Sequence, residues 1–323
     1  MKSKEDKNKI VVGIDVSKAD LVVRCSWEAN VKRFANTKSG IRKLTETLKA
    51  GNVDLVVCEH TGKYEQLLVS TLHDNDIPVH CAQPRAVHYF ARARKATAKS
   101  DPIDAETIML YGLTMDLKPD RPLTPALKAV KELAERRDDL RRMLVAEKNR
   151  LKAPAISNSL KTSIKAMIRT IENHLKKNEQ EMAKLVESEP SIKHPIEILT
   201  NEHGVGLISA ITIYAAMPEL GTLTRQTAGS LAGLAPILRE SGKFSGQRQI
   251  GGGRSLARHA LYLVAMSAIR KKGSPLQKFY VNLNKAGKRR IVALTAVMRK
   301  LIVRFNTLLK VMYQEPQINP VAS

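Results

Sequence analysis

Apolar residues in the first third of the chain occur in short runs separated by amphipathic segments, which predicts an α/β domain. The first three runs are short and follow one another closely, as expected for strands joined by tight turns. Helix-length segments with one apolar face then alternate with further apolar runs. This order favours a mixed sheet with helices on its faces. The predicted strands are residues 10–16, 21–26, 31–34, 53–59 and 78–82, and the predicted helices are residues 40–50 and 64–75.

A different pattern begins after a proline-rich linker at residues 118–125. From residue 127 to 187 the chain is rich in charge, and its apolar residues recur at intervals of three and four, with a break at residues 153–154. Asn178 occupies one position of the second apolar stripe, as residues that set the register of coiled coils do. The pattern predicts a helical hairpin or coiled-coil arm, either packed on its own domain or, as we favour, joining chains in an oligomer. The stripes are Val130, Leu133, Leu140, Leu144 and Leu151, then Ile164, Ile168, Ile171, Leu175, Met182 and Leu185.

The last part of the chain, residues 196–313, reads as mostly helical. Gly204 and Gly206 separate two apolar helical segments, an arrangement typical of a helix-hairpin-helix. In such units the glycine amides at a helix N-terminus bind a phosphate oxygen, although an ordinary junction between helices has the same appearance. We therefore divide the chain into a catalytic domain at residues 1–118, a linker and arm at residues 119–195, and a helical domain at residues 196–323.

The charge of the chain narrows the class of partner. Its 54 Lys and Arg against 31 Asp and Glu give a net charge of +23, with a pI near 10.0. The positive electrostatic field of such a chain favours binding to a polyanion, either nucleic acid or an anionic membrane. No uncharged apolar stretch is long enough for a membrane span, and the charged segment at residues 1–9 does not resemble a signal peptide. We therefore expect nucleic acid and no membrane.

Basic residues concentrate in two segments, residues 84–100 and residues 239–300. The second contains fifteen Lys and Arg and a single acid, Glu240. This density predicts contacts with a nucleic-acid backbone. Aromatic residues are only 4% of the chain, so base stacking is not expected to be the main mode of recognition. The candidate nucleic-acid-binding residues are Arg92, Arg94, Lys95, Lys99, Gly204, Gly206, Lys243, Arg248, Arg254 and Arg258.

The three cysteines, Cys25, Cys58 and Cys81, are too few and too widely spaced for a zinc site or a disulfide framework. Each lies in a strand-like run, which predicts buried structural thiols and a reducing cytoplasm.

Four acids stand out in this basic chain: Asp15, Glu59, Asp101 and Asp104. Asp15 and Glu59 end predicted strands, while Asp101 and Asp104 lie three residues apart at a predicted helix start and share a face. If the strand ending at Glu59 lies beside the first, all four can meet at one sheet edge. Clustered carboxylates repel one another, and two Mg²⁺ ions about 4 Å apart would neutralise them and clamp a phosphodiester. Separate structural roles are the alternative.

The motifs around these acids resemble those of the DEDD transposases of bacterial insertion sequences, of the IS116/IS110/IS902 type, and of the related Piv-type DNA invertases. The resemblance covers nearly the whole chain, and its specificity comes from the combination of motifs. The motifs are Gly13-Ile14-Asp15-Val16-Ser17-Lys18, Phe34-Ala35-Asn36-Thr37, Cys58-Glu59-His60-Thr61-Gly62, Lys99-Ser100-Asp101-Pro102-Ile103-Asp104-Ala105 and Leu231-Ala232-Gly233-Leu234-Ala235-Pro236.

This resemblance implies an α/β plus α architecture: a RuvC-like, RNase H-type N-terminal domain, a coiled-coil arm and a mostly helical transposase domain. It makes Asp15, Glu59, Asp101 and Asp104 the ligands of Mg²⁺, with Mn²⁺ as a substitute. It also implies a serine that attacks DNA, and the matching position is Ser241. The expected product is a phosphoserine joined to a DNA end.

Several other residues offer weaker candidates for the chemistry. Ser245 and Ser255 are rivals of Ser241, although Ser255 suits a helix cap. Tyr262 lies in an apolar run without the Arg-His-Arg set of tyrosine recombinases. His60 is expected to support the metal site or the fold, and His259 to pack or to contact phosphate.

The expected activity is that of a DNA transposase or site-specific recombinase. The resemblance implies double-stranded donor and target DNA as partners, a homo-oligomer (dimer or tetramer), and in many members a guide RNA encoded beside the gene. It places the protein in the bacterial cytoplasm, at the nucleoid when bound to DNA. The acids and Ser241 would form halves of one composite site, contributed by different subunits if the arm joins chains.

Four alternatives stay open at this point. One is a Piv-type invertase without guide RNA, and another is a RuvC-like metal-dependent nuclease that needs the acids but not Ser241. An actin-like ATPase would share the first strand but requires a second glycine-rich phosphate motif and a less basic chain. A nonenzymatic nucleic-acid-binding protein is the last.

Overall fold

The computed structural model describes residues 9–94, 101–237, 240–241, 244–245 and 249–314. The chain divides into two compact units, Met1–Pro122 and Leu123–Ser323. Each unit has its own hydrophobic core.

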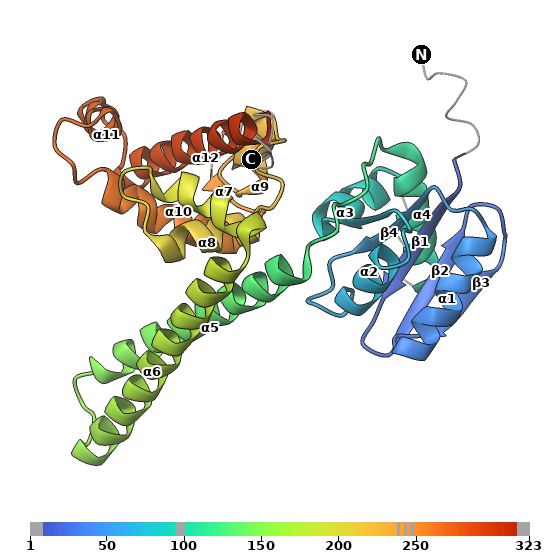
Figure 1. The fold of residues 1–323 in the computed structure, drawn as a ribbon, viewed down its shortest axis with the longest axis horizontal. Coiled ribbons are helices and arrows are strands. Elements are labelled where there is room, and N and C mark those ends of the chain that lie inside the picture. Colours follow the sequence, from blue (N-terminus) through green and yellow to red (C-terminus); the bar gives the residue numbers. More distant parts are fainter. Residues whose placement is uncertain (1–8, 95–100, 238–239, 242–243, 246–248, 315–323) are drawn as a thin grey trace, which may run out of the picture. The chain divides into compact units, whose positions relative to one another are not determined.

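The first unit is built on a five-stranded mixed sheet with strand order β3-β2-β1-β4-β5 (Figure 1). Strands β1, β2 and β3 form an antiparallel meander, whereas β4 and β5 run parallel to β1. The mixed sheet predicted from the sequence is therefore confirmed. The strands are β1 Val11–Val16, β2 Asp20–Cys25, β3 Val31–Ala35, β4 Leu55–Glu59 and β5 Val79–Ala82.

Helices cover both faces of this sheet, and strand alternation sorts the side chains between them. In β1, Val12 and Ile14 pack with α1 and α2, while Val11 packs on the opposite face with residues of α3 and α4. In β4, Cys58 faces α1 and α2, and Val57 faces α3 and α4. The helices are α1 Lys38–Ala50, α2 Gln66–His73, α3 Pro84–Ala93 and α4 Asp101–Thr114.

Two glycines allow α4 to lie against the sheet. A Cβ atom on Gly13 of β1 would overlap the Ala105 carbonyl and the Met109 amide of α4. A Cβ atom on Gly112 would overlap the side chains of Val11 and Val57. The absence of both side chains brings the start of α4 close to the end of β1.

Helix α3 is the element of this unit that the sequence did not predict. Its basic residues hide the helical pattern, because only Val87 is fully buried while Arg85 and Arg92 are exposed. Helix α4 is described from Asp101 onward, in agreement with the helix start predicted there, and residues 95–100 lie outside the described residues.

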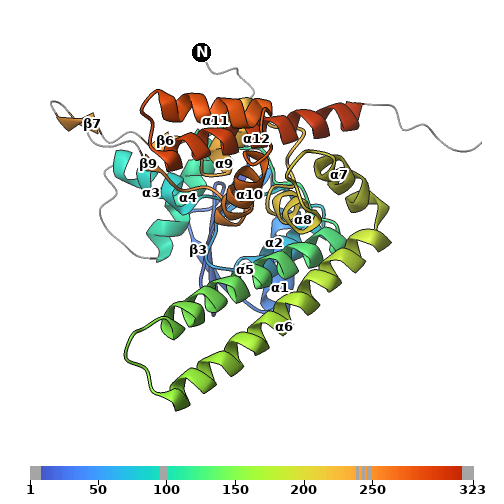
Figure 2. The ribbon, with the colours of Figure 1, turned by 90° about the vertical axis from the view of Figure 1, so that its left-hand side faces the viewer.

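The second unit begins with a helical hairpin of two long antiparallel helices, α5 Pro125–Leu151 and α6 Asn158–Ser188, which lie side by side in Figures 1 and 2. The Thr124 and Ser157 side chains cap their N-termini. At its base, Val130 and Met182 belong to the core of the second unit, and farther out Ile164 and Ile171 are also buried. The hairpin is thus partly packed on its own unit.

The remainder of the second unit is mostly helical, and its core surrounds the fully buried Phe305 of α12. Short strand pairs, β6 with β9 and β7 with β8, interrupt the helices. No helix in the described part of the chain has both the length and the apolar content that a bilayer span requires. The elements are α7 Pro190–Thr200, α8 Leu207–Ala216, α9 Arg225–Leu231, β6 Pro236–Ile237, β7 Glu240–Ser241, β8 Phe244–Ser245, β9 Gln249–Ile250, α10 Ser255–Ala268, α11 Pro275–Lys285 and α12 Arg290–Gln314.

Candidate active site

Asp15 and Glu59 lie next to each other at one edge of the sheet. Strands β1 and β4 are parallel neighbours, with Ile14 opposite Cys58, so the next residue of each strand is an acid. Every second side chain of a strand points to the same face of the sheet. Asp15 therefore shares the face of Val11, and Glu59 shares that of Val57, so both carboxylates face α4 rather than α1 and α2. Both residues are partly buried.

The other two acids, Asp101 and Asp104, occupy the first turn of α4, where the helix dipole favours negative charge. Both Asp101 and Asp104 contribute to raising the pKa of Asp15, and Asp104 also contributes to raising that of Glu59. The structure therefore brings the four predicted acids into one electrostatic neighbourhood of the first unit.

This neighbourhood makes ionisation of the strand-end acids costly. Burial raises the pKa of Asp15, and the charges of Asp104 and Asp101 raise it further. Burial, together with Asp15 and Asp104, raises the pKa of Glu59 to about 7. A hard divalent cation with a preference for oxygen ligands would relieve this repulsion. The donor set, all carboxylate, therefore fits Mg²⁺ or Mn²⁺.

The carboxylates of the four acids are spaced more widely than the ligands of a single ion. Across the described ranges, the one group of three or more His, Cys, Asp or Glu whose ligand atoms all lie within 4.8 Å of one another is His60, Glu65 and Cys81. Ions bound by the four acids would have to bring their side chains closer together.

Arg33 is a neighbour of the acids that sequence reasoning missed. It lies opposite Val22, and Val22 lies opposite Asp15, so the cross-strand row places Arg33 on the same face as Asp15. Its guanidinium is 3.3 Å from the Asp101 carboxylate and acts to lower the pKa of Asp15. Arg33 could be found from sequence only by knowing the register of β2 and β3.

The Phe34-Ala35-Asn36-Thr37 motif has a structural explanation near the site. The side-chain nitrogen Nδ2 of Asn36 donates to the carbonyls of Ser17 and Tyr64 and so joins the turns that follow β1 and β4. Thr37 caps α1 by accepting a hydrogen bond from the Gly40 amide.

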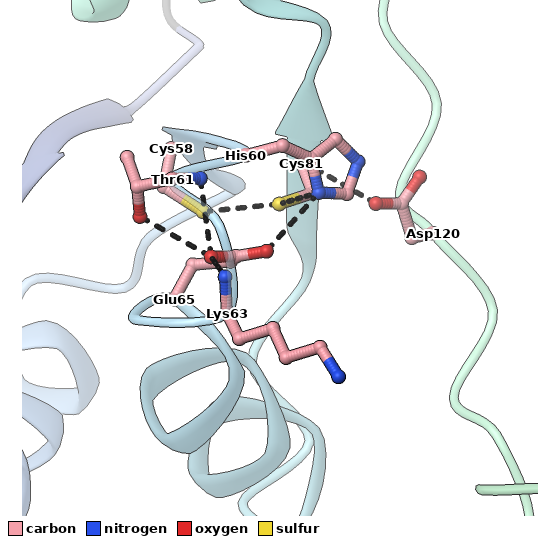
Figure 3. A network of polar contacts seen from close by, with 7 residues as sticks. All are labelled: Cys58, His60, Thr61, Lys63, Glu65, Cys81 and Asp120. Carbon is pink, nitrogen blue, oxygen red and sulfur yellow. Dashed lines mark hydrogen bonds and ion pairs between the residues drawn. The ribbon is translucent and has the colours of Figure 1, made fainter. Parts of the chain in front are cut away.

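A second cluster of polar side chains lies beside the end of β4 (Figure 3). His60 Nδ1 is 3.3 Å from Glu65 Oε1 and 3.4 Å from Cys81 Sγ. Cys58 Sγ is 3.7 Å from Cys81 Sγ, because Cys58 lies opposite Cys81 in the β4–β5 register. The wide chain spacing of the cysteines thus concealed their proximity. A signal was present, since Cys58 and Cys81 each immediately precede the last residue of their strands.

The pKa values in this cluster indicate a charged hydrogen-bond network. Hydrogen bonds to Cys81 and Glu65 raise the pKa of His60 to about 10. The hydrogen bond with Cys58, and then the contact with His60, lower the pKa of Cys81 to about 6. Burial acts to raise the pKa of Glu65, but its hydrogen bonds with His60 and backbone amides lower it to about 2.

Ser241 is in β7 of the second unit. In the sequence, β7 and β8 lie between β6 and β9, which pair with each other. Ser241 pairs with Phe244 of β8, while Glu240 pairs with Ser245. The base of this segment is closely packed, because the Arg254 amide donates to the Leu231 carbonyl and a Cβ on Gly253 would overlap Gly233. The Leu231–Pro236 motif therefore packs at the base of the Ser241 segment, the part of the chain between β6 and β9 that carries Ser241.

Two of the basic candidates, Arg254 and Arg258, have partners within the second unit. Arg254 forms two bonds with Glu219, at 2.5 and 2.6 Å, and donates to the Ala216 carbonyl. Arg258 donates to the Gly252 carbonyl at 2.7 Å. Both arginines thus support the base of the Ser241 segment, which is a structural role that the charge pattern alone did not indicate.

The remaining candidates differ in their surroundings. Gly204 has φ +86°, and a Cβ there would overlap Ala268 of α10, so close packing explains this glycine. Gly206 is the residue before α8 and has open space around its Cβ position. Arg92 and Arg94 are exposed. Lys95, Lys99, Lys243 and Arg248 lie outside the described residues.

Three of the weaker candidates, Tyr262, His259 and Ser255, lie on α10. Tyr262 and His259 lie on α10 beside a groove of about 380 Å³ between α5, α8 and α10. His259 Nδ1 is 3.3 Å from Asp138, and Ser255 is the first residue of α10 rather than its cap.

Comparison with known proteins relates both units to one group of sequences. Residues 12–154 match the DEDD transposase family of the IS110 type, and residues 196–281 match the family described as Transposase IS116/IS110/IS902. A pilin gene-inverting protein of Moraxella bovis is 24% identical over 306 residues, which cover 91% of this chain and 94% of the relative. The pilin gene-inverting protein of Moraxella lacunata is 23% identical over the same length and coverage.

Proposed function

Because this chain belongs to the IS116/IS110/IS902 transposases, which are related to the pilin gene-inverting proteins, we propose that it cuts and rejoins double-stranded DNA through metal ions at four carboxylates and a nucleophilic serine. The family establishes an enzyme of the transposase or recombinase class that acts on DNA. The metal, the serine and any RNA are our proposals.

The observation that carries the proposal is the meeting of Asp15, Glu59 and the first turn of α4 at one sheet edge. A stable fold gains nothing from gathering four acids, since burial and mutual repulsion disfavour their charged forms. This cost is explained if the edge binds cations during catalysis. The mixed sheet with acids at the ends of β1 and β4 also supports a RuvC-like first domain.

Asp15, Glu59, Asp101 and Asp104 would hold two Mg²⁺ ions. When bound, such ions neutralise charge on a phosphodiester and stabilise its attacking and leaving oxygens. Arg33, which pairs with Asp101, adds a positive charge beside these carboxylates.

Ser241 supplies the attacking hydroxyl. Its Oγ loses a proton and forms a bond to phosphorus, while the bond from phosphorus to one deoxyribose oxygen breaks and that oxygen takes up a proton. The resulting phosphoserine conserves the phosphodiester bond energy, so a hydroxyl of another strand can reverse the reaction and join new DNA ends.

A guide RNA, pairing with donor and target DNA, would choose the sites, and the protein would act as a homo-oligomer at the bacterial nucleoid. The alternative is site-specific inversion without RNA, which is favoured by the likeness to pilin gene-inverting proteins over 91% of the chain. Sequencing the nucleic acid that copurifies with the protein separates the two. A structured RNA with loops matching donor and target supports guidance, whereas its absence from active protein supports inversion.

The metal site is tested with Asp15→Ala in a Mg²⁺-dependent cleavage and joining assay. Glu106→Ala is the matched control, because Glu106 is an exposed acid in the same helix as Asp104. Asp15→Ala should lose activity by at least about 100-fold while DNA binding remains, since it removes stabilisation of the transition state. Full activity of Asp15→Ala, or equal loss in Glu106→Ala, would contradict the assignment.

The serine is tested separately with Ser241→Ala, using Ser245→Ala on the neighbouring strand β8 as the control. Ser241→Ala should abolish the covalent protein–DNA adduct, detected by denaturing gel, together with recombination. Cleavage that persists without an adduct would instead support a metal-dependent nuclease, and recombination by Ser241→Ala would exclude the serine mechanism.

A further inference from the structure

The cluster beside β4 has the geometry of a transition-metal site distinct from the four acids. Its three ligand atoms are His60 Nδ1, Glu65 Oε1 and Cys81 Sγ, and the residues' ligand atoms all lie within 4.8 Å of one another. The individual separations are 3.3 Å from nitrogen to oxygen and 3.4 Å from nitrogen to sulfur.

These separations match what a tetrahedral zinc ion requires. With bonds of about 2.0–2.1 Å to nitrogen or oxygen and about 2.3 Å to sulfur, tetrahedral angles place neighbouring ligand atoms roughly 3.3–3.8 Å apart. Little movement of these three ligands would therefore be needed to accept the metal. The Sγ atom of Cys58, 3.7 Å from that of Cys81, lies outside the group of ligand atoms that are all within 4.8 Å of one another.

The turn after β4 also orients Glu65 as a ligand. Its Oε2 accepts hydrogen bonds from the amides of Thr61 and Lys63, at 3.1 and 3.0 Å, and from the Thr61 hydroxyl at 3.2 Å. These bonds leave Oε1 directed at His60 and Cys81 (Figure 3). Such outer contacts fix metal ligands in known sites.

Access and chemistry favour zinc over magnesium. The His60 side chain is 46% exposed, so an ion can enter from solvent, while the Glu65 side chain is only 10% exposed. Thiolate and imidazole select zinc and similar transition metals, whereas Mg²⁺ prefers oxygen ligands only.

We propose that His60, Glu65 and Cys81 bind a Zn²⁺ ion, with the fourth position taken by water. His60 directly follows Glu59, so the ion would clamp the turn after β4 and position Glu59 at the sheet edge. His60 Nδ1 already lies within hydrogen-bonding distance of both Glu65 Oε1 and Cys81 Sγ, and zinc would replace these contacts.

The test is zinc binding by the full chain carrying Asp15→Asn, which weakens the acidic site and simplifies the stoichiometry. Protein kept under a thiol-free reductant is stripped with chelator, reloaded, desalted and measured for metal by mass spectrometry. We expect about one zinc per chain. Co²⁺ in place of zinc should give thiolate-to-cobalt charge-transfer bands, a signature of Cys ligation in the unmutated cluster. No retained zinc and no such bands would overturn the proposal.

Matched variants locate the ion. Cys81→Ala should weaken zinc binding by more than about 100-fold, whereas Cys25→Ala, which removes a buried cysteine of β2 that is not among the cluster's ligands, should not change it. Thr61→Val should weaken binding about 10-fold, as for other outer contacts. Circular dichroism checks that each variant is folded. Equal zinc affinity in Cys81→Ala and Cys25→Ala would place the ion elsewhere and overturn the proposal. The assay contains no DNA, so its result is independent of the recombinase proposal.

Discussion

Burial of the Glu59 carboxyl group affects both its protonation and its capacity to bind a metal ion. Its pKa of about 7 lies above the ordinary value of 4.5, so the folded, metal-free protein binds a proton that the unfolded chain releases. The contribution of Glu59 to the free energy of unfolding should therefore fall as the pH rises from about 4.5 through about 7. A divalent ion competes with that proton, so stabilisation by Mg²⁺ or Mn²⁺ should grow over the same range.

Thermal unfolding with and without Mn²⁺ at pH 5.5 and pH 8 measures this effect. The pH dependence of the stabilisation by Mn²⁺ should become weaker in Glu59→Gln, which cannot ionise. A shift of the melting temperature by Mn²⁺ that is equal at both pH values would contradict the assigned role of Glu59.

Gly13 should tolerate no side chain. Gly13→Ala would force α4, which carries Asp101 and Asp104, away from the end of β1. We expect about 1–3 kcal/mol lower stability, the usual cost of overpacking, together with loss of DNA cleavage. Chemical denaturation measures the first effect, and the assay for Asp15→Ala measures the second.

Gly229→Ala is the control for this substitution. It lies in α9, and its Cβ position has no atom within 4 Å. Because Ala favours helix more than Gly, this variant should be neutral or more stable by up to about 1 kcal/mol. Equal destabilisation by both substitutions would show that the close approach of α4 to Gly13 has no special importance.

At this scale the sequence predicted the acids and missed their partners, for a physical reason. Asp15, Glu59 and Asp101 are marked by local signals, namely strand ends and a helix start. Arg33 and Cys81 reach their clusters through pairing between strands, and pairing depends on register rather than on nearby residues.

Among the elements, the hairpin of α5 and α6 buries the polar side chain of Asn178. The Asn178 side chain is 6% exposed, and its Oδ1 has no hydrogen-bond partner among the described residues. On the same hairpin, Arg137 of α5 and Glu179 of α6 form an ion pair at 2.7 Å. A buried carbonyl without a partner costs about 1–3 kcal/mol, so this asparagine is retained for something other than stability.

Asn178→Leu should stabilise the protein by about 1 kcal/mol, because the unsatisfied group is removed. If Asn178 sets the pairing of arms between chains, the variant should also lose its single oligomeric state. Denaturation and light scattering after size exclusion measure the two effects. Higher stability with an unchanged oligomer would mean that Asn178 does not determine assembly.

The elements themselves were largely predictable where the apolar pattern was strong. The five strands and α1 follow from short apolar runs and a clear amphipathic period. Helix α3 was missed because its basic face carries exposed Arg85 and Arg92 around one buried valine. The strand pairs around Ser241 were missed because two-residue strands have no period to detect.

For the molecule as a whole, the net charge of +23 predicts steeply salt-dependent DNA binding. The affinity should fall by at least about 100-fold between 50 and 200 mM salt, because each phosphate contact releases counterions. A triple variant, Arg270→Gln, Lys271→Gln and Lys272→Gln, removes three cations that follow α10. The slope of log affinity against log salt should flatten by about 0.9 for each residue that contacts phosphate.

Arg254→Gln is the contrasting variant. Since Arg254 is engaged with Glu219, its loss should lower the melting temperature and leave the salt slope unchanged. Binding titrations at several salt concentrations measure the slopes. A nearly flat salt dependence in the unmodified protein would contradict the electrostatic basis of DNA binding.

The alternation along β4 places two kinds of donor on opposite sides of one strand. Cys58 faces α1 and α2, while the next residue, Glu59, faces α4. Shifting β4 by one residue would exchange these faces, placing sulfur among the acids and a carboxylate beside Cys81. A one-residue insertion or deletion at residues 51–54 would therefore alter the metal preference of the sheet edge without changing any acid. We therefore expect a change in the length of this loop to be tolerated less well than a change in its amino-acid composition. Loop length is then the feature to compare when relatives are sorted into active and inactive copies.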